Sequence, residues 1–223
     1  MLVLIGGEKG GTGKTTIAVN LAAIRVSSGR DVLLLDIDPQ LTATLWASRR
    51  DENDIEPRVS SLQKVLDRKI ISPGSVIRYE IEAQLYKYED IIIDAGGADT
   101  EVLRAAITLA DKIILPITPS ELDMWTFSHL DSLMSIAKKN EEQKGWVLIN
   151  KLSTNKGSAN KDLIDVDDFL SDYTNIKRLS NCLYDRKPIK KATAKGLAIT
   201  EFKPSDDKAE IEMLAVYEEI FND

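Results

Sequence analysis

Cysteine and histidine are nearly absent from this sequence. Its 223 residues include one cysteine, Cys182, and one histidine, His129. A single cysteine excludes an internal disulfide, and it is too few to supply one subunit's share of a cysteine-ligated iron–sulfur cluster. A single histidine excludes a two-histidine zinc site. We therefore expect both to be packing or surface residues.

Long apolar runs are also missing. No run approaches the ~20 residues that a membrane-spanning helix needs, and we expect no cleavable signal segment before the first apolar strand. The formal net charge of −7 argues against indiscriminate binding of nucleic acid, so contact with DNA would require a local basic patch. With 43% hydrophobic residues the chain can bury one sizeable core. These properties predict a single domain over residues 1–223, located in the cytoplasm.

A glycine-rich stretch near the N-terminus is the most informative part of the chain. Leu2–Ile5 is a short apolar run, typical of a strand that is buried on both faces of a parallel sheet. Gly10, Gly11 and Gly13 then allow backbone N–H groups to converge on an anion, because residues without a Cβ adopt positive φ easily. A helix predicted over Ile17–Val26 adds the partial positive charge of its N-terminus. The stretch therefore predicts a phosphate-binding loop.

The lysines of this loop identify the kind of phosphate loop. From Lys9 to Thr16 it reads Lys-Gly-Gly-Thr-Gly-Lys-Thr-Thr, and Glu8 stands where the common pattern has glycine. The match is instead to the deviant Walker A motif, which carries an additional lysine. In this motif the chain resembles the ParA family of partition ATPases, with MinD-type ATPases as relatives. The resemblance implies an ATP site formed by Lys9, Gly10, Gly11, Thr12, Gly13, Lys14, Thr15 and Thr16.

Three side chains of the loop have separate expected roles. Lys14 is expected to reach the β- and γ-phosphates, and the Thr15 hydroxyl is expected to ligate Mg²⁺. By resemblance, Lys9 reaches across a two-fold axis to the phosphates of a partner subunit. ATP would then hold a homodimer together, and hydrolysis would release it.

Two further strands are predicted to end in carboxylates beside this loop. The second strand, Asp31–Asp36, leads into Asp38, a segment that resembles the Walker A′ motif; the resemblance implies that Asp38 orients the attacking water and Asp36 supports the Mg²⁺ shell. A simpler alternative is that both aspartates cap the following helix. The third strand, Tyr88–Asp94, has the Walker B pattern, in which Asp94 holds Mg²⁺ through water. The predicted metal set is therefore Thr15, Asp36 and Asp94, although a purely structural Asp94 is the alternative.

Later segments give weaker signals. Asn150 ends a fifth predicted strand, where related ATPases contact adenine, but it is equally compatible with a simple turn residue. Pro116–Asp123 resembles a family segment that lies along the dimer face. Met124, Trp125 and Phe127 follow closely, and they suit either an interface or the core.

One segment reverses the acidic balance of the chain. Residues 186–203 carry six basic side chains against Glu201 alone. The segment is similar to the C-terminal part of ParA proteins that bind DNA without sequence preference, and phosphate contacts need charge but no base-reading side chains. A solvated charged face is the alternative. The candidate DNA contacts are Arg186, Lys187, Lys190, Lys191, Lys195 and Lys203.

The remaining segments are predicted from local patterns alone. The final helix, Lys208–Phe221, is expected to bury Ile211, Leu214, Ala215 and Ile220. Four other segments complete the assignment: a solvated loop over Arg49–Asp54, a strand over Glu56–Ser60, a helix over Leu62–Arg68 and a polar loop over Thr154–Asn160.

These expectations combine into one hypothesis. The fold is α/β, a twisted and mostly parallel sheet flanked by helices, as in P-loop NTPases. The expected function is an ATP- and Mg²⁺-dependent dimerising ATPase that binds DNA without sequence preference, and the resemblance implies plasmid or chromosomal cargo and a ParB-like centromere-binding adaptor. It would act in the cytoplasm on the nucleoid, without a membrane. The alternatives are a membrane-cycling ATPase of the MinD type, which the acidic final helix disfavours, and a metabolic ATPase of the same fold.

Overall fold

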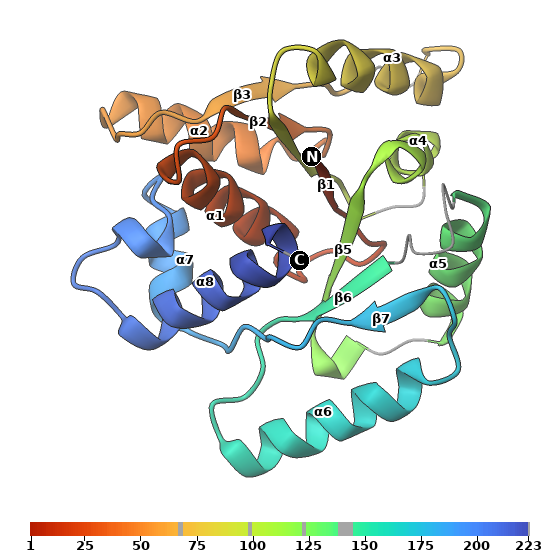
Figure 1. The fold of residues 1–223 in the computed structure, drawn as a ribbon, viewed down its shortest axis with the longest axis vertical. Helices are drawn as coiled ribbons and strands as arrows, with labels where there is room; N and C mark the ends of the chain where they lie inside the picture. Colours follow the sequence, from red (N-terminus) through yellow and green to blue (C-terminus); the bar gives the residue numbers. More distant parts are fainter. Residues whose placement is uncertain (67–68, 98–99, 122–123, 138–144, 223) are drawn as a thin grey trace.

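A computed structural model describes residues 1–66, 69–97, 100–121, 124–137 and 145–222 (Figure 1). The described strands form one parallel sheet in the order β3-β2-β4-β1-β5-β6-β7. Their bounds are β1 Leu2–Ile5, β2 Val32–Asp36, β3 Ser60–Gln63, β4 Asp90–Asp94, β5 Lys112–Ile117, β6 Gly145–Ile149 and β7 Ile176–Arg178. The predicted α/β class is confirmed.

Helices cover both faces of the sheet (Figure 1). The α-helices are α1 Lys14–Ser27, α2 Thr42–Glu52, α3 Pro73–Leu85, α4 Glu101–Leu109, α5 Met124–Ala137, α6 Lys156–Leu170, α7 Lys187–Thr193 and α8 Asp207–Phe221. Two short 3-10 turns, η1 Pro119–Glu121 and η2 Ile199–Glu201, connect them. None of the helices in the described part of the chain combines the length and the apolar character needed to cross a bilayer.

The core has two layers because alternate strand residues point to opposite faces. Val3 and Ile5 of β1 pack against α1, α2, α7 and α8, whereas Leu2 and Leu4 pack against α3, α4, α5 and α6. All four side chains are fully buried or nearly so. Parallel strands buried on both faces are continuous apolar runs, which is why the sequence identified β1 correctly.

Strand order places three chain segments at one edge of the sheet. In the parallel register, Asp94 of β4 pairs with both Ile5 of β1 and Asp36 of β2. The loop after β1, the carboxylate that ends β2 and the carboxylate that ends β4 are therefore neighbours. In open parallel sheets ligands bind at this carboxyl edge.

Several local predictions were wrong, and tertiary contacts explain the differences. The predicted loop Arg49–Asp54 is helical to Glu52, and Arg50 is 1% exposed because a distant carboxylate pairs with it. The strand lies at Ser60–Gln63 instead of Glu56–Ser60, so the helix predicted from Leu62 does not begin there; residues 67–68 of that prediction lie outside the described residues.

Two helices also differ from the prediction. α6 begins at Lys156, inside the predicted polar loop, because the Asn155 side chain caps its first N–H groups. In α8, Ile211 is 65% exposed, while Met213 and Val216 are buried. The solvent-exposed side of this helix therefore includes an isoleucine that the apolar pattern had assigned to the core.

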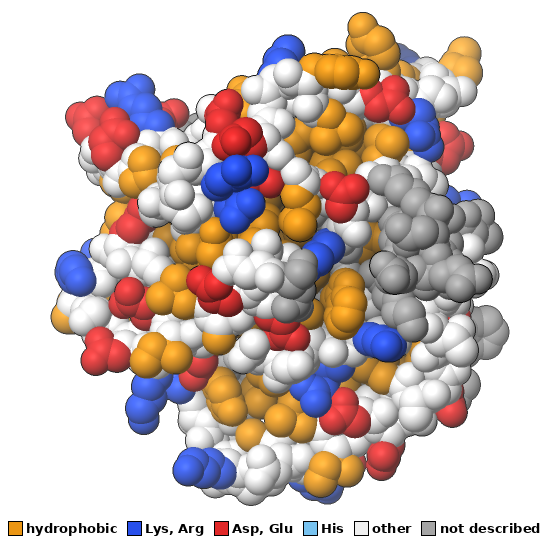
Figure 2. Space-filling view, viewed as in Figure 1, with side chains coloured by type: hydrophobic (Ala, Val, Ile, Leu, Met, Phe, Trp, Pro, Cys, Tyr) orange, Lys and Arg blue, Asp and Glu red, His pale blue; other side chains and the backbone are white. Residues whose placement is uncertain are grey.

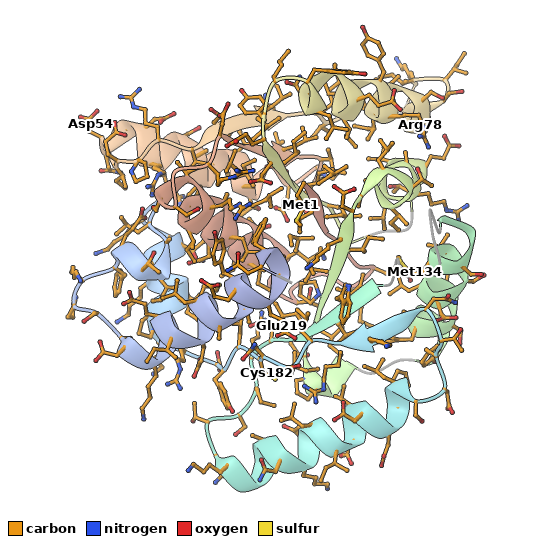
Figure 3. All side chains as sticks on the ribbon, viewed as in Figure 1. Met1, Asp54, Arg78, Met134, Cys182 and Glu219 are labelled. Atoms are coloured by element: carbon orange, nitrogen blue, oxygen red, sulfur yellow. The ribbon has the colours of Figure 1, made fainter. Side chains whose placement is uncertain are left out.

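The side chains of the visible face are mixed in charge and polarity (Figure 2). Cys182 follows β7 and lies close to Glu219 of α8 (Figure 3). The Cys182 side chain is partly buried against the core, and this burial raises the pKa of its thiol.

Candidate nucleotide site

Three glycines of the loop between β1 and α1 have a positive φ, and Gly7 is the first of them at +137°. Gly11 has φ +80° and Gly13 has φ +97°, in the left-handed region that other residues rarely adopt. A Cβ on Gly13 would also lie 2.2 Å from Nδ2 of Asn150. After Gly13, α1 begins at Lys14, three residues earlier than predicted. Its first turn therefore adjoins the loop, which is the arrangement that binds anions at helix N-termini.

Lys14 is the first residue of α1 and is 6% exposed. Its Nζ donates a hydrogen bond to the backbone carbonyl of Lys9 at 2.6 Å. Lys9 is partly buried, and Thr12 is 3% exposed. The side chain of one motif lysine is thus hydrogen-bonded to the backbone of the other.

Asp94 ends β4 with an unsatisfied carboxylate oxygen. Its Oδ2 accepts a hydrogen bond from the Thr15 hydroxyl at 2.7 Å, whereas the buried Oδ1 has no hydrogen-bond partner. The side chain is fully buried. Burial is the main cause that raises the pKa of Asp94 to about 7, and the nearby carboxylates of Asp36 and Asp38 act in the same direction.

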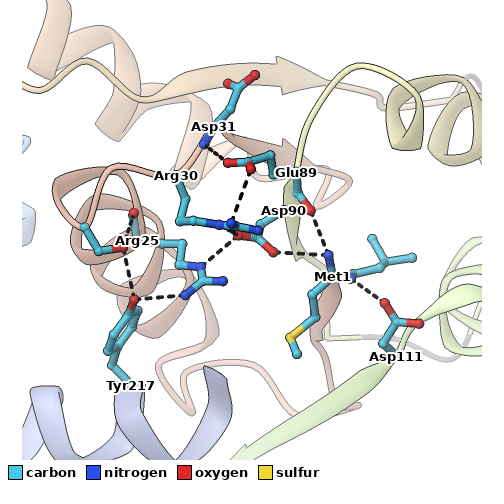
Figure 4. Close-up of polar contacts among 10 residues, drawn as sticks. Met1, Arg25, Arg30, Asp31, Glu89, Asp90, Asp111 and Tyr217 are labelled. Carbon is cyan, nitrogen blue, oxygen red and sulfur yellow. Dashed lines mark hydrogen bonds and ion pairs between the residues drawn. The ribbon is translucent and has the colours of Figure 1, made fainter. Parts of the chain in front are cut away.

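At the opposite end of β4, the buried carboxylate of Asp90 is paired with three cationic groups. Asp90 is 1% exposed and accepts hydrogen bonds from Arg25 at 2.8 Å, Arg30 at 3.2 Å and the amino group of Met1 at 3.1 Å (Figure 4). Burial opposes ionisation, but these partners outweigh it and hold the pKa of Asp90 below its usual value. Asp94 Oδ2 accepts its hydrogen bond from the neutral Thr15 hydroxyl instead of a cation, so Asp94 is suited to an added positive charge.

The carboxylate of Asp36, which ends β2, is hydrogen-bonded to the first turn of α2. Oδ2 of Asp36 accepts from the backbone N–H of Thr44 at 2.8 Å and from its hydroxyl at 2.9 Å. Burial raises the pKa of Asp36, although these hydrogen bonds oppose the shift. Asp36 therefore does cap the following helix, as the alternative interpretation of the sequence expected, through its bond to the Thr44 N–H. Asp38 caps a shorter turn, since its Oδ1 accepts from the N–H of Gln40 at 2.8 Å.

These groups fit a magnesium ion that is shared with phosphates. Among the described residues, no group of three or more histidine, cysteine or carboxylate side chains is placed to hold a metal ion by itself. Mg²⁺ is usually bound by only one or two carboxylates, with water and substrate phosphates completing its shell. The Thr15 hydroxyl and the unsatisfied oxygen of Asp94 suit that role, and Asp36 lies beside them in the strand register.

A cleft of about 1000 Å³ opens over the loop. Its volume is at the upper end of the range typical of small-molecule sites. The β4–α4 loop forms one wall and packs tightly on the phosphate loop, since a Cβ on Gly97 would lie 3.0 Å from the backbone nitrogen of Gly10. Residues that line the cleft include Gly10, Gly11, Gly13, Lys14, Thr15, Thr16, Asp38, Lys64, Gly96, Lys151 and Lys190.

Comparison with known proteins identifies this arrangement. A family model described as the CobQ/CobB/MinD/ParA nucleotide binding domain matches residues 3–219. The chain belongs to this family. It is 27% identical over 140 residues to protein ParA of Rhizobium radiobacter, covering 63% of this chain and 58% of that protein.

Two maintenance of carboxysome distribution proteins A (McdA) also resemble the chain. It is 35% identical over 124 residues to the maintenance of carboxysome distribution protein A of Gloeobacter kilaueensis, covering 55% of this chain and 51% of that protein. The chain thus spans somewhat more than half the length of these curated relatives. An ATP complex of a Cyanothece McdA variant has a TM-score of 0.70 at 18% identity, covering 98% of this chain and 95% of that one, which supports the fold alone.

Asn150 lies where this family was expected to contact adenine, but its side chain contacts the loop. Asn150 is 8% exposed, and its Nδ2 donates to the Thr12 carbonyl at 2.7 Å. Lys151, which the sequence reasoning did not single out, donates from Nζ to the Gly11 carbonyl. The available signal was its position directly after a predicted strand end on the carboxyl edge.

Glu8 and His129 form another contact that the sequence did not reveal. The Glu8 carboxylate lies 3.6 Å from Nε2 of His129 on α5. The acidic residue that departs from the common pattern is therefore directed toward α5. Of the apolar residues near the start of α5, Phe127 is buried in the core, while the side chains of Met124 and Trp125 lie outside the described residues.

The basic residues of 186–203 are not equivalent. Arg186 forms a bidentate ion pair with Glu212, with a shortest distance of 2.6 Å, so its charge is used within the fold. Lys190 lies 3.3 Å from Asp185 and lines the nucleotide cleft, and Lys195 lies over the ring of Phe202. The exposed lysines of the segment are Lys187, Lys190, Lys191, Lys195 and Lys203.

A buried ion pair attaches this basic segment to α2. Arg50 donates to both carboxylate oxygens of Glu201 at 2.6 and 2.7 Å and to the Gly196 carbonyl at 3.2 Å. Gly196 has φ +77°, and a Cβ there would lie 2.8 Å from the backbone nitrogen of Arg50. From α1, Oδ1 of Asn20 accepts from the N–H of Ile199 at 2.7 Å. Helices that begin at the nucleotide site therefore hold the segment that follows α7.

Proposed function

We propose that residues 1–223 form one P-loop ATPase domain that works as an ATP-dependent dimerising switch. In the ATP state it binds DNA without sequence preference, and a centromere-binding adaptor stimulates hydrolysis during segregation or positioning of cargo. Family membership supports nucleotide binding. The name of one relative, maintenance of carboxysome distribution protein A, supports the cargo role.

The residues of the site have distinct roles in this proposal. Lys14 neutralises the phosphates of its own nucleotide, and Lys9 contacts the nucleotide of the partner subunit. Asp38, on the wall of the cleft, orients the attacking water. Thr15, Asp94 and Asp36 hold Mg²⁺, which supplies charge neutralisation to the phosphates when bound.

One observation carries the DNA part of the proposal: the basic helix borders the nucleotide cleft. Lys190 lines the cleft, while Lys187 and Lys191 are exposed and four residues apart on α7. Two such helices, one from each subunit of an ATP dimer, would double a phosphate-binding surface that a monomer presents only once. Nucleotide-dependent affinity for DNA follows from this arrangement.

A membrane-cycling role is less well supported, because the final helix is already packed. Met213, Val216 and Ile220 of α8 are fully buried in the core between α8 and the sheet. A helix that lies on a membrane needs a free apolar face and a basic polar face. Here the polar side carries Glu212 and Glu219, which bind Arg186 and the N–H groups of residues 180–181.

The test is ATP-dependent binding to DNA of unrelated sequence. The variant Lys187→Glu/Lys191→Glu removes two exposed lysines that do not line the cleft, so we expect at least tenfold weaker DNA binding with unchanged ATP hydrolysis. Lys156→Glu/Lys161→Glu on α6 is the matched control for net charge, and it should retain DNA binding. Equal losses in both variants, or no loss in the first, would contradict the proposed surface.

A further inference from the structure

Two neighbouring residues at the end of β6 hold the phosphate loop by its backbone. Asn150 donates to the Thr12 carbonyl at 2.7 Å, and Lys151 donates to the Gly11 carbonyl. These carbonyls belong to successive peptide groups of the loop. The contacts join parts of the chain that are distant in sequence, so they fix the loop relative to the sheet.

The position of a carbonyl determines where the neighbouring N–H points. In a planar trans peptide, the C=O of one residue and the N–H of the next point in opposite directions. Bonds that hold the carbonyls of Gly11 and Thr12 on the side of β6 therefore direct the N–H groups of Thr12 and Gly13 to the other side. Gly11 and Gly13 line the cleft, where backbone N–H groups would bind phosphate.

The arrangement leaves the Asn150 side chain little freedom. Its Oδ1 accepts from the N–H of Lys151 at 2.9 Å, so both ends of the amide are engaged. A Cβ on Gly13 would lie 2.2 Å from its Nδ2. Lys151 itself has φ +55°, a conformation that is strained for a residue with a side chain. The bond to the Thr12 carbonyl uses one of the two N–H groups of the Asn150 amide.

We propose that Asn150 and Lys151 are positioning residues for the phosphate loop. They orient its peptide N–H groups, and they thereby set the affinity for the polyphosphate of any nucleotide instead of the choice of base. The inference rests on the proposed nucleotide site, but it is independent of dimerisation and DNA binding.

The test compares ligands that share phosphates but differ in the base. Affinities of Lys151→Met and Asn150→Ala for ATP, GTP and inorganic triphosphate are measured with Mg²⁺. Loss of a hydrogen bond to a charged or buried group predicts a reduction of about tenfold for all three ligands, with an unchanged ratio of ATP to GTP affinity. Lys151→Arg, which keeps a donor, should restore most of the affinity. Lys156→Met on α6 is the matched control and should bind like the wild type.

Each other outcome contradicts the proposal in a distinct way. If Asn150→Ala weakens ATP alone and changes the ratio of ATP to GTP affinity, Asn150 reads the base. If Lys151→Met binds all three ligands like the wild type, its contact with Gly11 does not position the loop. If Asn150→Ala fails to fold, the comparison of Lys151→Met with Lys151→Arg decides. A wild type that binds none of the ligands overturns the nucleotide site itself.

Discussion

Replacing Asp94 with asparagine should reveal the cost of a buried, unpaired carboxylate. Burial raises the pKa of Asp94 to about 7, well above that of an aspartate in the unfolded chain, so between these two values the folded protein holds a proton that the unfolded chain has lost. Its contribution is favourable at low pH and is lost as pH rises toward the folded pKa. Each pH unit in this window changes the free energy of unfolding by about 1.4 kcal/mol.

The magnitude follows from the width of the window. Between pH 5 and pH 8 about two units lie below the folded pKa, so the wild type should lose about 3 kcal/mol relative to Asp94→Asn. The amide cannot ionise, and its own imperfect hydrogen bonding is independent of pH. Taking the difference between the two proteins therefore isolates the carboxylate.

Urea unfolding without nucleotide, in EDTA, at several pH values measures this difference. Asp172→Asn, at an exposed position, is the control and should show no divergence from the wild type, because water solvates that carboxylate in both states. A constant difference between wild type and Asp94→Asn from pH 5 to pH 8 would refute the reasoning. Adding Mg²⁺ with ATP at pH 8 should stabilise the wild type more than the variant, since the ion neutralises the carboxylate.

The remaining predictions concern single side chains of the switch. Lys14→Ala should lower ATP affinity at least a hundredfold in equilibrium binding, because a buried ammonium would be lost from the phosphate loop. Asp38→Ala should bind ATP but hydrolyse it at least a hundredfold more slowly in a phosphate-release assay, leaving long-lived dimers. Arg50→Lys keeps the charge but loses the bidentate fork, so the ratio of DNA affinities with and without ATP should fall at least fivefold, while the exposed Arg58→Lys leaves it unchanged.

The nucleotide edge of the fold could be predicted because its signals are local. The strand over Leu2–Ile5 matches β1 residue for residue, and Asp36 and Asp94 end their strands as expected. Apolar runs identify strands buried on both faces, and parallel strands bring their carboxyl ends together. The contact between Thr15 and Asp94 follows from these two rules alone.

The sequence did not reveal features that depend on contacts between residues far apart in the chain. Arg50 has the local appearance of a solvated residue in a charged run, yet Glu201, more than a hundred residues later, buries it. Lys151 adopts a positive φ, which its residue type does not favour. Ile211 satisfies the helical apolar pattern but faces away from the core. Local propensity cannot decide such cases, because tertiary packing overrides it.

Helices α1 and α2 connect the proposed nucleotide and DNA sites. Each does so through side-chain hydrogen bonds. On α1, Asn20 donates to the Thr16 carbonyl of the first turn and accepts from Ile199 beyond the basic helix. On α2, Thr44 near one end donates a hydrogen bond to Asp36, and Arg50 near the other end donates to Glu201. At about 1.5 Å per residue, those six positions span roughly 9 Å of rigid helix. Neutralising Asp36 with Mg²⁺ would weaken its hold on the start of α2, and any resulting rotation of α2 would be carried to Arg50. By thermodynamic reciprocity, DNA bound to the basic helix would then strengthen nucleotide binding by the factor with which nucleotide strengthens DNA binding.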